Sequence, residues 1–221
     1  MFINKQQNKG FTLVELMVGL AIGTIVLGAA VTIFLTASKH SRDTINSARL
    51  NQELQTAVQM MSEDIRRAGY WGQAITGIDS GSNDNPFMTT ATDITINASN
   101  NCILLTYDRD SDGVLPNIGT GTDDERYGYR LSNQALQSRP TGASFSCTAA
   151  ASDWENITDP NVVQITAFTV TNNQSSVPID AVSNLILRRI DISVTGQLTT
   201  DTSYSKTLVN SIRVRNDKFV P

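Results

Sequence analysis

The chain has few of the residues with which enzymes build active sites. Its 221 residues include one histidine, His40, and two cysteines, Cys102 and Cys147. A Ser-His-Asp relay or a histidine-based metal site needs histidine close to its partners, and His40 follows a long apolar run, away from any expected pocket. Residues 119–121 (GTG) lack the lysine and helix that a phosphate-binding loop requires. The sequence therefore predicts a structural protein that is not an enzyme and requires no cofactor.

Positive charge is also scarce. The chain has 17 lysines and arginines against 21 aspartates and glutamates, a formal net charge of −4 and an isoelectric point near 4.9. An acidic chain holds phosphate backbones poorly, and the arginine pairs at residues 66–67 and 188–189 are too sparse to form a binding stripe. We therefore expect no direct binding of nucleic acid, and we interpret these arginines as solvated or paired with acids.

Residues 11–35 contain a single ionisable group, Glu15. As a helix this apolar run extends roughly 37 Å, enough to cross a hydrocarbon core about 30 Å thick. The residues before it carry Lys5 and Lys9 but no acid, and such positive flanks stay on the cytoplasmic side. We therefore expect one membrane-spanning helix, with its amino end in the cytoplasm and the bulk of the chain outside.

Glu15 needs a partner, because an ionised side chain in a membrane helix costs about 3 kcal/mol or more. No lysine or arginine in residues 11–36 can supply one. An amino group created by cleavage on a neighbouring subunit would satisfy the carboxylate and set the axial offset between subunits. The alternative is a signal anchor with Glu15 unpaired among the lipid headgroups, although secretory signals carry their charge before the apolar core and small residues after it.

Residues 9–16 (KGFTLVEL) resemble, residue for residue, the class III signal of type IV pilins and type II secretion pseudopilins. The resemblance implies that a prepilin peptidase cuts after Gly10 and methylates the new amine of Phe11. It also implies that Glu15 pairs with the terminal amine of a neighbouring subunit during assembly.

An apolar stripe continues the helical period beyond the membrane-length run. Its members recur at spacings of three or four and are Leu50, Leu54, Val58, Met61, Ile65 and Ala68. No proline interrupts residues 11–69, and Gly69 offers a C-terminal stop. The sequence thus predicts a leader over residues 1–10, a transmembrane half-helix over 11–35, an amphipathic half over 36–69, and a β-rich periplasmic or extracellular globular domain over 70–221.

The remaining chain alternates β-branched or aromatic runs with loops rich in Gly, Ser, Asn and Asp. Expected strands cover residues 94–98, 102–107, 127–131, 162–170, 185–195 and 204–214, and the main loops are 79–86 and 119–124. A pilin-like α+β fold follows, in which the long helix packs on an antiparallel β-sheet domain.

Both cysteines fall in the part expected outside the cytoplasm, where disulfides persist. We expect Cys102 and Cys147 to be bonded to each other, closing a loop of about 45 residues. Two free buried thiols are the alternative.

The end of the expected helix, residues 64–72 (DIRRAGYWG), resembles that of PilW-type minor pilins, and the J-type minor pseudopilin of type II secretion has a related ending. Later parts of the PilW-like pattern are also present, namely residues 107–113, residues 127–131, Cys102, Cys147 and Trp154. Major pilins usually carry a proline at the place of Thr32, so this departure favours a minor subunit. Tyr70 and Trp71 are expected to wedge the helix onto the sheet.

Asp108, Asp110 and Asp112, followed by Gly113, match the opening of oxygen-rich calcium loops. The twelfth position of such a loop is Gly119 instead of a bidentate glutamate, and Asp123, Asp124 or Glu125 could substitute. A calcium site and a solvated acidic turn therefore remain two open interpretations.

The resemblances imply a minor pilin of the type IV pilus, part of the complex that initiates assembly and a candidate for the pilus tip, with effects on piliation, twitching motility and DNA uptake. Expected partners are other minor pilins, the major pilin, prepilin peptidase, the inner-membrane assembly platform and membrane lipid. The protein would lie in the inner membrane before assembly and in the pilus at the cell surface afterwards. Two alternatives stay open: a J-type minor pseudopilin of a type II secretion system, and a membrane-anchored calcium-binding domain that never polymerises.

Overall fold

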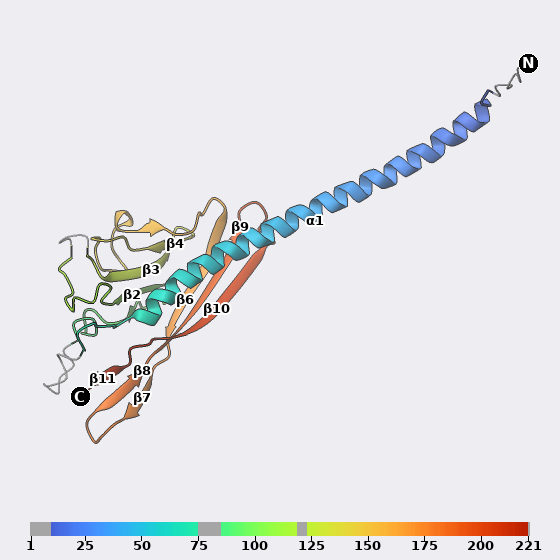
Figure 1. Cartoon of the computed structure of the whole chain (residues 1–221). Coiled ribbons are helices and arrows are strands. Elements are labelled where there is room, and N and C mark those ends of the chain that lie inside the picture. Colours follow the sequence, from blue (N-terminus) through green and yellow to red (C-terminus); the bar gives the residue numbers. More distant parts are fainter. Residues whose placement is uncertain (1–9, 75–84, 119–122, 221) are drawn as a thin grey trace, which may run out of the picture. The chain divides into compact units, whose positions relative to one another are not determined.

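The structure, a computed structural model, describes residues 10–74, 85–118 and 123–220 (Figure 1). The chain divides into two compact units, Met1–Asn46 and Ser47–Pro221. One helix, α1 (Leu13–Arg67), contributes residues to both units. The expected leader, except Gly10, and most of the two expected main loops lie outside the described residues.

In the first unit, the described residues form the amino-terminal part of α1. Its large apolar side chains are exposed, among them Leu13, Ile25 and Phe34. By length and composition, α1 is apolar enough to cross a membrane. An exposed apolar surface of this length is what a helix in lipid presents.

In the second unit, the stripe predicted from the sequence forms one side of the core. All six of its residues are buried: Leu50, Leu54, Val58, Met61, Ile65 and Ala68. The helix ends at Arg67, and Gly69 follows with a φ of +72°, a conformation that favours glycine. The predicted amphipathic half-helix and its glycine stop are therefore confirmed, with an end two residues earlier.

The described residues of this unit also form three antiparallel sheets. The first has the order β1 (Thr95–Ile96), β2 (Cys102–Thr106), β3 (Arg126–Ser132), β4 (Ala135–Ser138) and β5 (Glu155–Asn156), with the short helix η2 (Ala151–Asp153) before β5. The second has the order β10 (Ser205–Arg213), β9 (Arg189–Leu198) and β6 (Val163–Asn172), and α1 runs across it (Figure 1). The third has the order β11 (Lys218–Val220), β8 (Asn184–Leu187) and β7 (Ser175–Pro178). This arrangement confirms the α+β fold.

The strand β2 is buried on both faces, because successive side chains of a strand point in opposite directions. Ile103 and Leu105 join the main core with the α1 stripe. Cys102 and Leu104 face the other way and form a second, smaller cluster with Trp154. The strand therefore links the helix-covered core to the disulfide region.

The prediction of a single strand over residues 185–195 was wrong. The chain breaks at Arg188, leaving β8 in one sheet and β9 in another. The Arg188 guanidinium is buried, pairs with Asp93 at 2.6 Å and donates to the carbonyl oxygens of Ala68 and Asn216. This interaction holds the strand junction beside the end of α1. The sequence analysis also did not predict four short strands, β4, β5, β7 and β11.

Gly196 in β9 allows close packing of α1 on the sheet. A Cβ atom there would lie 2.9 Å from Leu54 Cδ2, and Leu54 is fully buried. We expect Gly196→Ala to lower the free energy of unfolding by about 1–3 kcal/mol through overpacking. Ser193→Ala, in the same strand but facing away from the core, should change it by less than about 0.5 kcal/mol. Equilibrium denaturation of both variants tests this, and equal midpoints would contradict it.

Candidate functional site

The residues expected at the cleavage site lie at the start of α1. Gly10 and Phe11 precede the helix and are exposed, Phe11 to 87%. The Thr12 hydroxyl accepts a hydrogen bond from the Glu15 N–H at 3.3 Å, while the Glu15 carboxylate accepts from the Thr12 N–H at 3.1 Å. This reciprocal pair is a capping box, which satisfies two N–H groups that a helix start otherwise leaves free. Glu15 therefore has a local partner of its own, a role that we did not predict.

Three threonine hydroxyls in the membrane-length part of α1 or directly after it are satisfied within the helix. The hydroxyls of Thr24, Thr32 and Thr36 donate to backbone carbonyls three or four residues earlier, each at 2.8 Å. Hydroxyls bonded in this way do not have to find water in a lipid environment. The helix continues through Thr32, where major pilins usually carry a proline.

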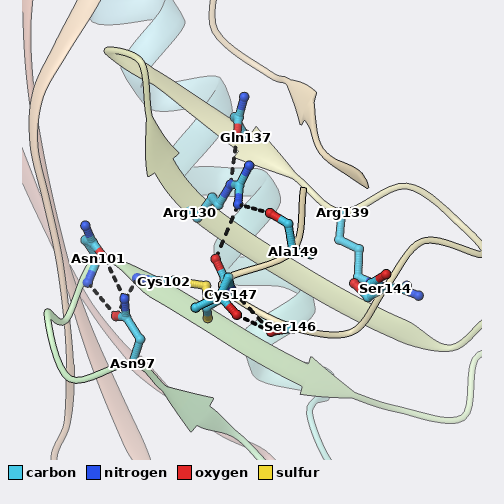
Figure 2. The surroundings of a disulfide bond; sticks show 11 residues. Asn97, Asn101, Cys102, Arg130, Gln137, Arg139, Ser144, Ser146, Cys147 and Ala149 are labelled. Atoms are coloured by element: carbon cyan, nitrogen blue, oxygen red, sulfur yellow. Dashed lines mark hydrogen bonds between the residues drawn. A yellow bond between two sulfur atoms is a disulfide. The ribbon is translucent and has the colours of Figure 1, made fainter. Parts of the chain in front are cut away.

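Cys102 and Cys147 form a disulfide, as predicted, with a Cα–Cα distance of 6.0 Å (Figure 2). The bond ties the segment after β4 to the first residue of β2. Arg130 of β3 supports the same segment by donating to the carbonyl oxygens of Cys147 at 3.3 Å and Ala149 at 3.0 Å (Figure 2). Its guanidinium also lies 4.4 Å from the Trp154 ring, a cation–π contact. A covalent bond and an arginine thus hold one loop against the sheet.

Two of the three aspartates of the candidate calcium loop meet at the end of β2, and a glutamate replaces the third. Asp108, Asp110 and Glu125 each place one carboxylate oxygen within 4.8 Å of the others. Asp108 lies two residues after β2 and Glu125 one residue before β3, so the antiparallel pairing of these strands brings the two acids together. Burial and the nearby Asp108 charge raise the pKa of Glu125 to about 7.

Asp112 lies apart from this group. Its carboxylate accepts a hydrogen bond from the Val114 N–H at 2.7 Å, which makes it a turn-forming residue. The Asp123 carboxylate shares a hydrogen bond with the Asp110 carboxylate and pairs with Arg109 at 3.4 Å. Asp124 is buried, and hydrogen bonds from Gly142 and Arg139 keep its pKa below the usual range although burial acts in the opposite direction. Of the three substitutes that the sequence offered, Glu125 is the one that lies close to both Asp108 and Asp110.

The sequence analysis missed a half-buried acid near the end of α1. Asp64 accepts hydrogen bonds from the hydroxyls of Tyr107, at 2.9 Å, and Tyr129. Burial raises the pKa of Asp64, partly offset by these two donors. The three side chains join α1 to β3 and to the end of β2. Asp64 does not interrupt the apolar stripe of α1, so the sequence pattern gives no sign of its role. That role is visible only in the folded chain, where the two tyrosines face Asp64.

Tyr70 and Trp71 do not wedge α1 onto the sheet as expected. Tyr70 is 41% exposed. The Trp71 indole N–H instead donates to the Gly113 carbonyl at 3.2 Å, so this ring packs on the acidic loop. The reason is that the chain turns at Gly69 and then runs along the acidic loop. The hydrogen bond that the Asp108 N–H donates to the Tyr70 carbonyl shows this path.

Comparisons with known proteins agree with this arrangement. Residues 43–214 match the family model described as prepilin peptidase-dependent protein B, and residues 5–31 match the prokaryotic N-terminal methylation motif. The chain is 23% identical over 170 residues to prepilin peptidase-dependent protein B of Escherichia coli, covering 77% of this chain and 81% of that protein. It is 35% identical over 65 residues to the pilin-like protein PilA3 of Thermus thermophilus, covering 28% of each chain. No solved structure matches. Together with a membrane-length helix that begins in a prepilin signal, these matches show that the chain belongs to the prepilin peptidase-dependent protein B family.

Proposed function

We propose that this protein is a PilW-like minor pilin of a type IV pilus, which joins other minor pilins in the complex that initiates assembly and occupies the pilus tip. Its role would be structural, and the major pilin and the inner-membrane assembly platform would be its further partners. The observation that carries the proposal is the methylation motif over residues 5–31 followed by the family match over residues 43–214.

The prepilin signal supports processing by prepilin peptidase, with cleavage after Gly10 and methylation of Phe11. Both residues are exposed, so the peptide bond between them is accessible. Before cleavage, the apolar part of α1 would anchor the protein in the inner membrane. After cleavage, the amine of Phe11 and the carboxylate of Glu15 would supply opposite charges for pairing between subunits.

Two features support this assignment. Thr32 stands where major pilins usually carry a proline, and α1 is unbroken there. The family match covers the second compact unit almost completely, so the similarity extends beyond the signal that all such proteins share. A tip position fits a protein that is needed in few copies.

A deletion strain tests the proposal. We expect loss of most surface pili and of twitching motility, with recovery when the gene is supplied in trans. Pili are counted by electron microscopy and shear preparation, and export of folded enzymes is measured in the same strain. Normal piliation with blocked export would instead identify a J-type pseudopilin of type II secretion. Normal piliation and normal export, without crosslinks to other pilins, would favour a domain that does not polymerise.

A further inference from the structure

We propose that Asp108, Asp110 and Glu125 form a calcium site at the junction of β2 and β3, with Asp112 outside it. Calcium prefers oxygen ligands and accepts several carboxylates together with carbonyl groups and water. The three acids approach one another within 4.8 Å without a histidine or cysteine among them, a donor set that suits calcium better than zinc.

Two buried carboxylate oxygens at this place have no donor among the residues that the structure describes. Asp108 and Glu125 are each 1% exposed. Oδ1 of Asp108 and Oε2 of Glu125 have no hydrogen-bond partner among the described residues. A buried, unsatisfied carboxylate oxygen is costly, because it loses its hydration without compensation. A cation would satisfy both oxygens.

Among the described residues, no basic side chain forms an ion pair with the group. Among the ion pairs of the described residues, Arg109 contacts Asp123, and Arg126 contacts Asp124. None of these ion pairs reaches Asp108, Asp110 or Glu125. Arg109 acts on Asp110 as a nearby charge without an ion pair. Carboxylates whose oxygens lie within 4.8 Å of one another repel when they are charged, so a divalent cation would remove a repulsion that destabilises the fold.

The surrounding backbone holds the other oxygens of the two buried acids in place. Oδ2 of Asp108 accepts from the N–H groups of Gly72 at 2.8 Å and Gly113 at 3.0 Å. Oε1 of Glu125 accepts from the Arg109 N–H. Gly113 has a φ of +79°, so the turn that supplies one of these donors depends on glycine. Each acid thus has one oxygen fixed by the backbone and one left for a ligand.

Calcium at this place would connect three segments of the fold. Gly72 follows the end of α1, Asp108 follows β2, and Glu125 precedes β3. Binding would hold the end of the helix to the sheet and order the acidic loop. Extracellular calcium-binding modules have dissociation constants of about 0.1–1 mM, and we expect the calcium affinity of this site to lie in the same range.

The test uses the full-length protein in detergent micelles, with terbium as a luminescent calcium analogue. Trp71 contacts the loop through Gly113, and its excitation should sensitise bound terbium. Calcium should displace terbium, and the melting temperature should rise in millimolar calcium relative to chelator, with a smaller effect of magnesium. No terbium signal and no calcium-dependent shift of the melting temperature would overturn the proposal.

Three variants identify the ligands. Glu125→Gln and Asp110→Asn should each weaken calcium binding by about tenfold or more, since each removes a carboxylate from the set. The Asp110→Asn variant should fold, because Asp110 is exposed. The side-chain oxygen of asparagine can still accept the hydrogen bond from the Asp112 N–H. Asp112→Asn is the matched control and should bind within about threefold of the unmodified protein, because its role is a turn hydrogen bond.

Two further outcomes would also overturn the proposal. Equal loss of binding in Asp112→Asn and Glu125→Gln would show that Asp112 is also a ligand, contrary to the site described. A more stable Glu125→Gln protein that is indifferent to calcium would show that Asp108 and Glu125 share a proton instead of a metal ion.

Discussion

Glu15→Gln should reduce incorporation of the protein into pili by about tenfold or more, while leaving the start of α1 intact. Glutamine at this position preserves the capping box with Thr12, because the amide oxygen still accepts from the Thr12 N–H. It removes the charge that would pair with the terminal amine of another subunit, and an unpaired charge or amine in the membrane costs about 3 kcal/mol. Quantitative immunoblotting of sheared pili, with mass spectrometry of the processed terminus, measures the effect.

Thr12→Ala is the control that separates the two roles of Glu15. It removes the hydroxyl that accepts from the Glu15 N–H but keeps the carboxylate. Loss of a threonine cap costs about 1 kcal/mol, so incorporation should fall much less than in Glu15→Gln. If Glu15→Gln assembles as well as the unmodified protein, pairing between subunits does not depend on this charge. If Thr12→Ala is the more defective variant, capping is the main role of Glu15.

Replacing Cys102 and Cys147 together by serine should lower the free energy of unfolding of the domain by about 4 kcal/mol. The disulfide closes a loop with a sequence separation of 45 residues, and this loop gains conformational freedom in the unfolded chain when the bond is absent. Serine also places polar groups in the cluster formed by Cys102, Leu104 and Trp154. Denaturation of a fragment over residues 37–221, followed by tryptophan fluorescence, measures the loss.

The unmodified fragment under reducing conditions provides the comparison for this variant. It should lose a similar part of its stability, because reduction opens the same loop without changing the sequence. A loss below about 1 kcal/mol in both samples would mean that Arg130 and its carbonyl partners hold the segment without the bond.

The sequence alone predicted the features that depend on local patterns. The apolar run after Gly10 and the three-and-four spacing from Leu50 to Ala68 indicated the two halves of α1, because a helix repeats every 3.6 residues. Alternating and β-branched runs indicated the longer strands, and the glycine at residue 69 indicated where the helix ends. The disulfide could be inferred because only two cysteines are present and both lie in the part expected outside the cytoplasm.

Tertiary structure alone decided which distant residues meet. Arg188 divides an apparently continuous strand because its guanidinium reaches Asp93, which lies 95 positions earlier. Asp64 acquires two tyrosine donors from β3 and the end of β2, and no local pattern encodes that contact. The aspartate spacing indicated Asp112 as a ligand, but β2–β3 pairing brings Glu125 beside Asp108 and Asp110 instead. The physical reason is that periodicity records which face of an element is buried, whereas charge pairing and ligand sets depend on which elements the fold places side by side.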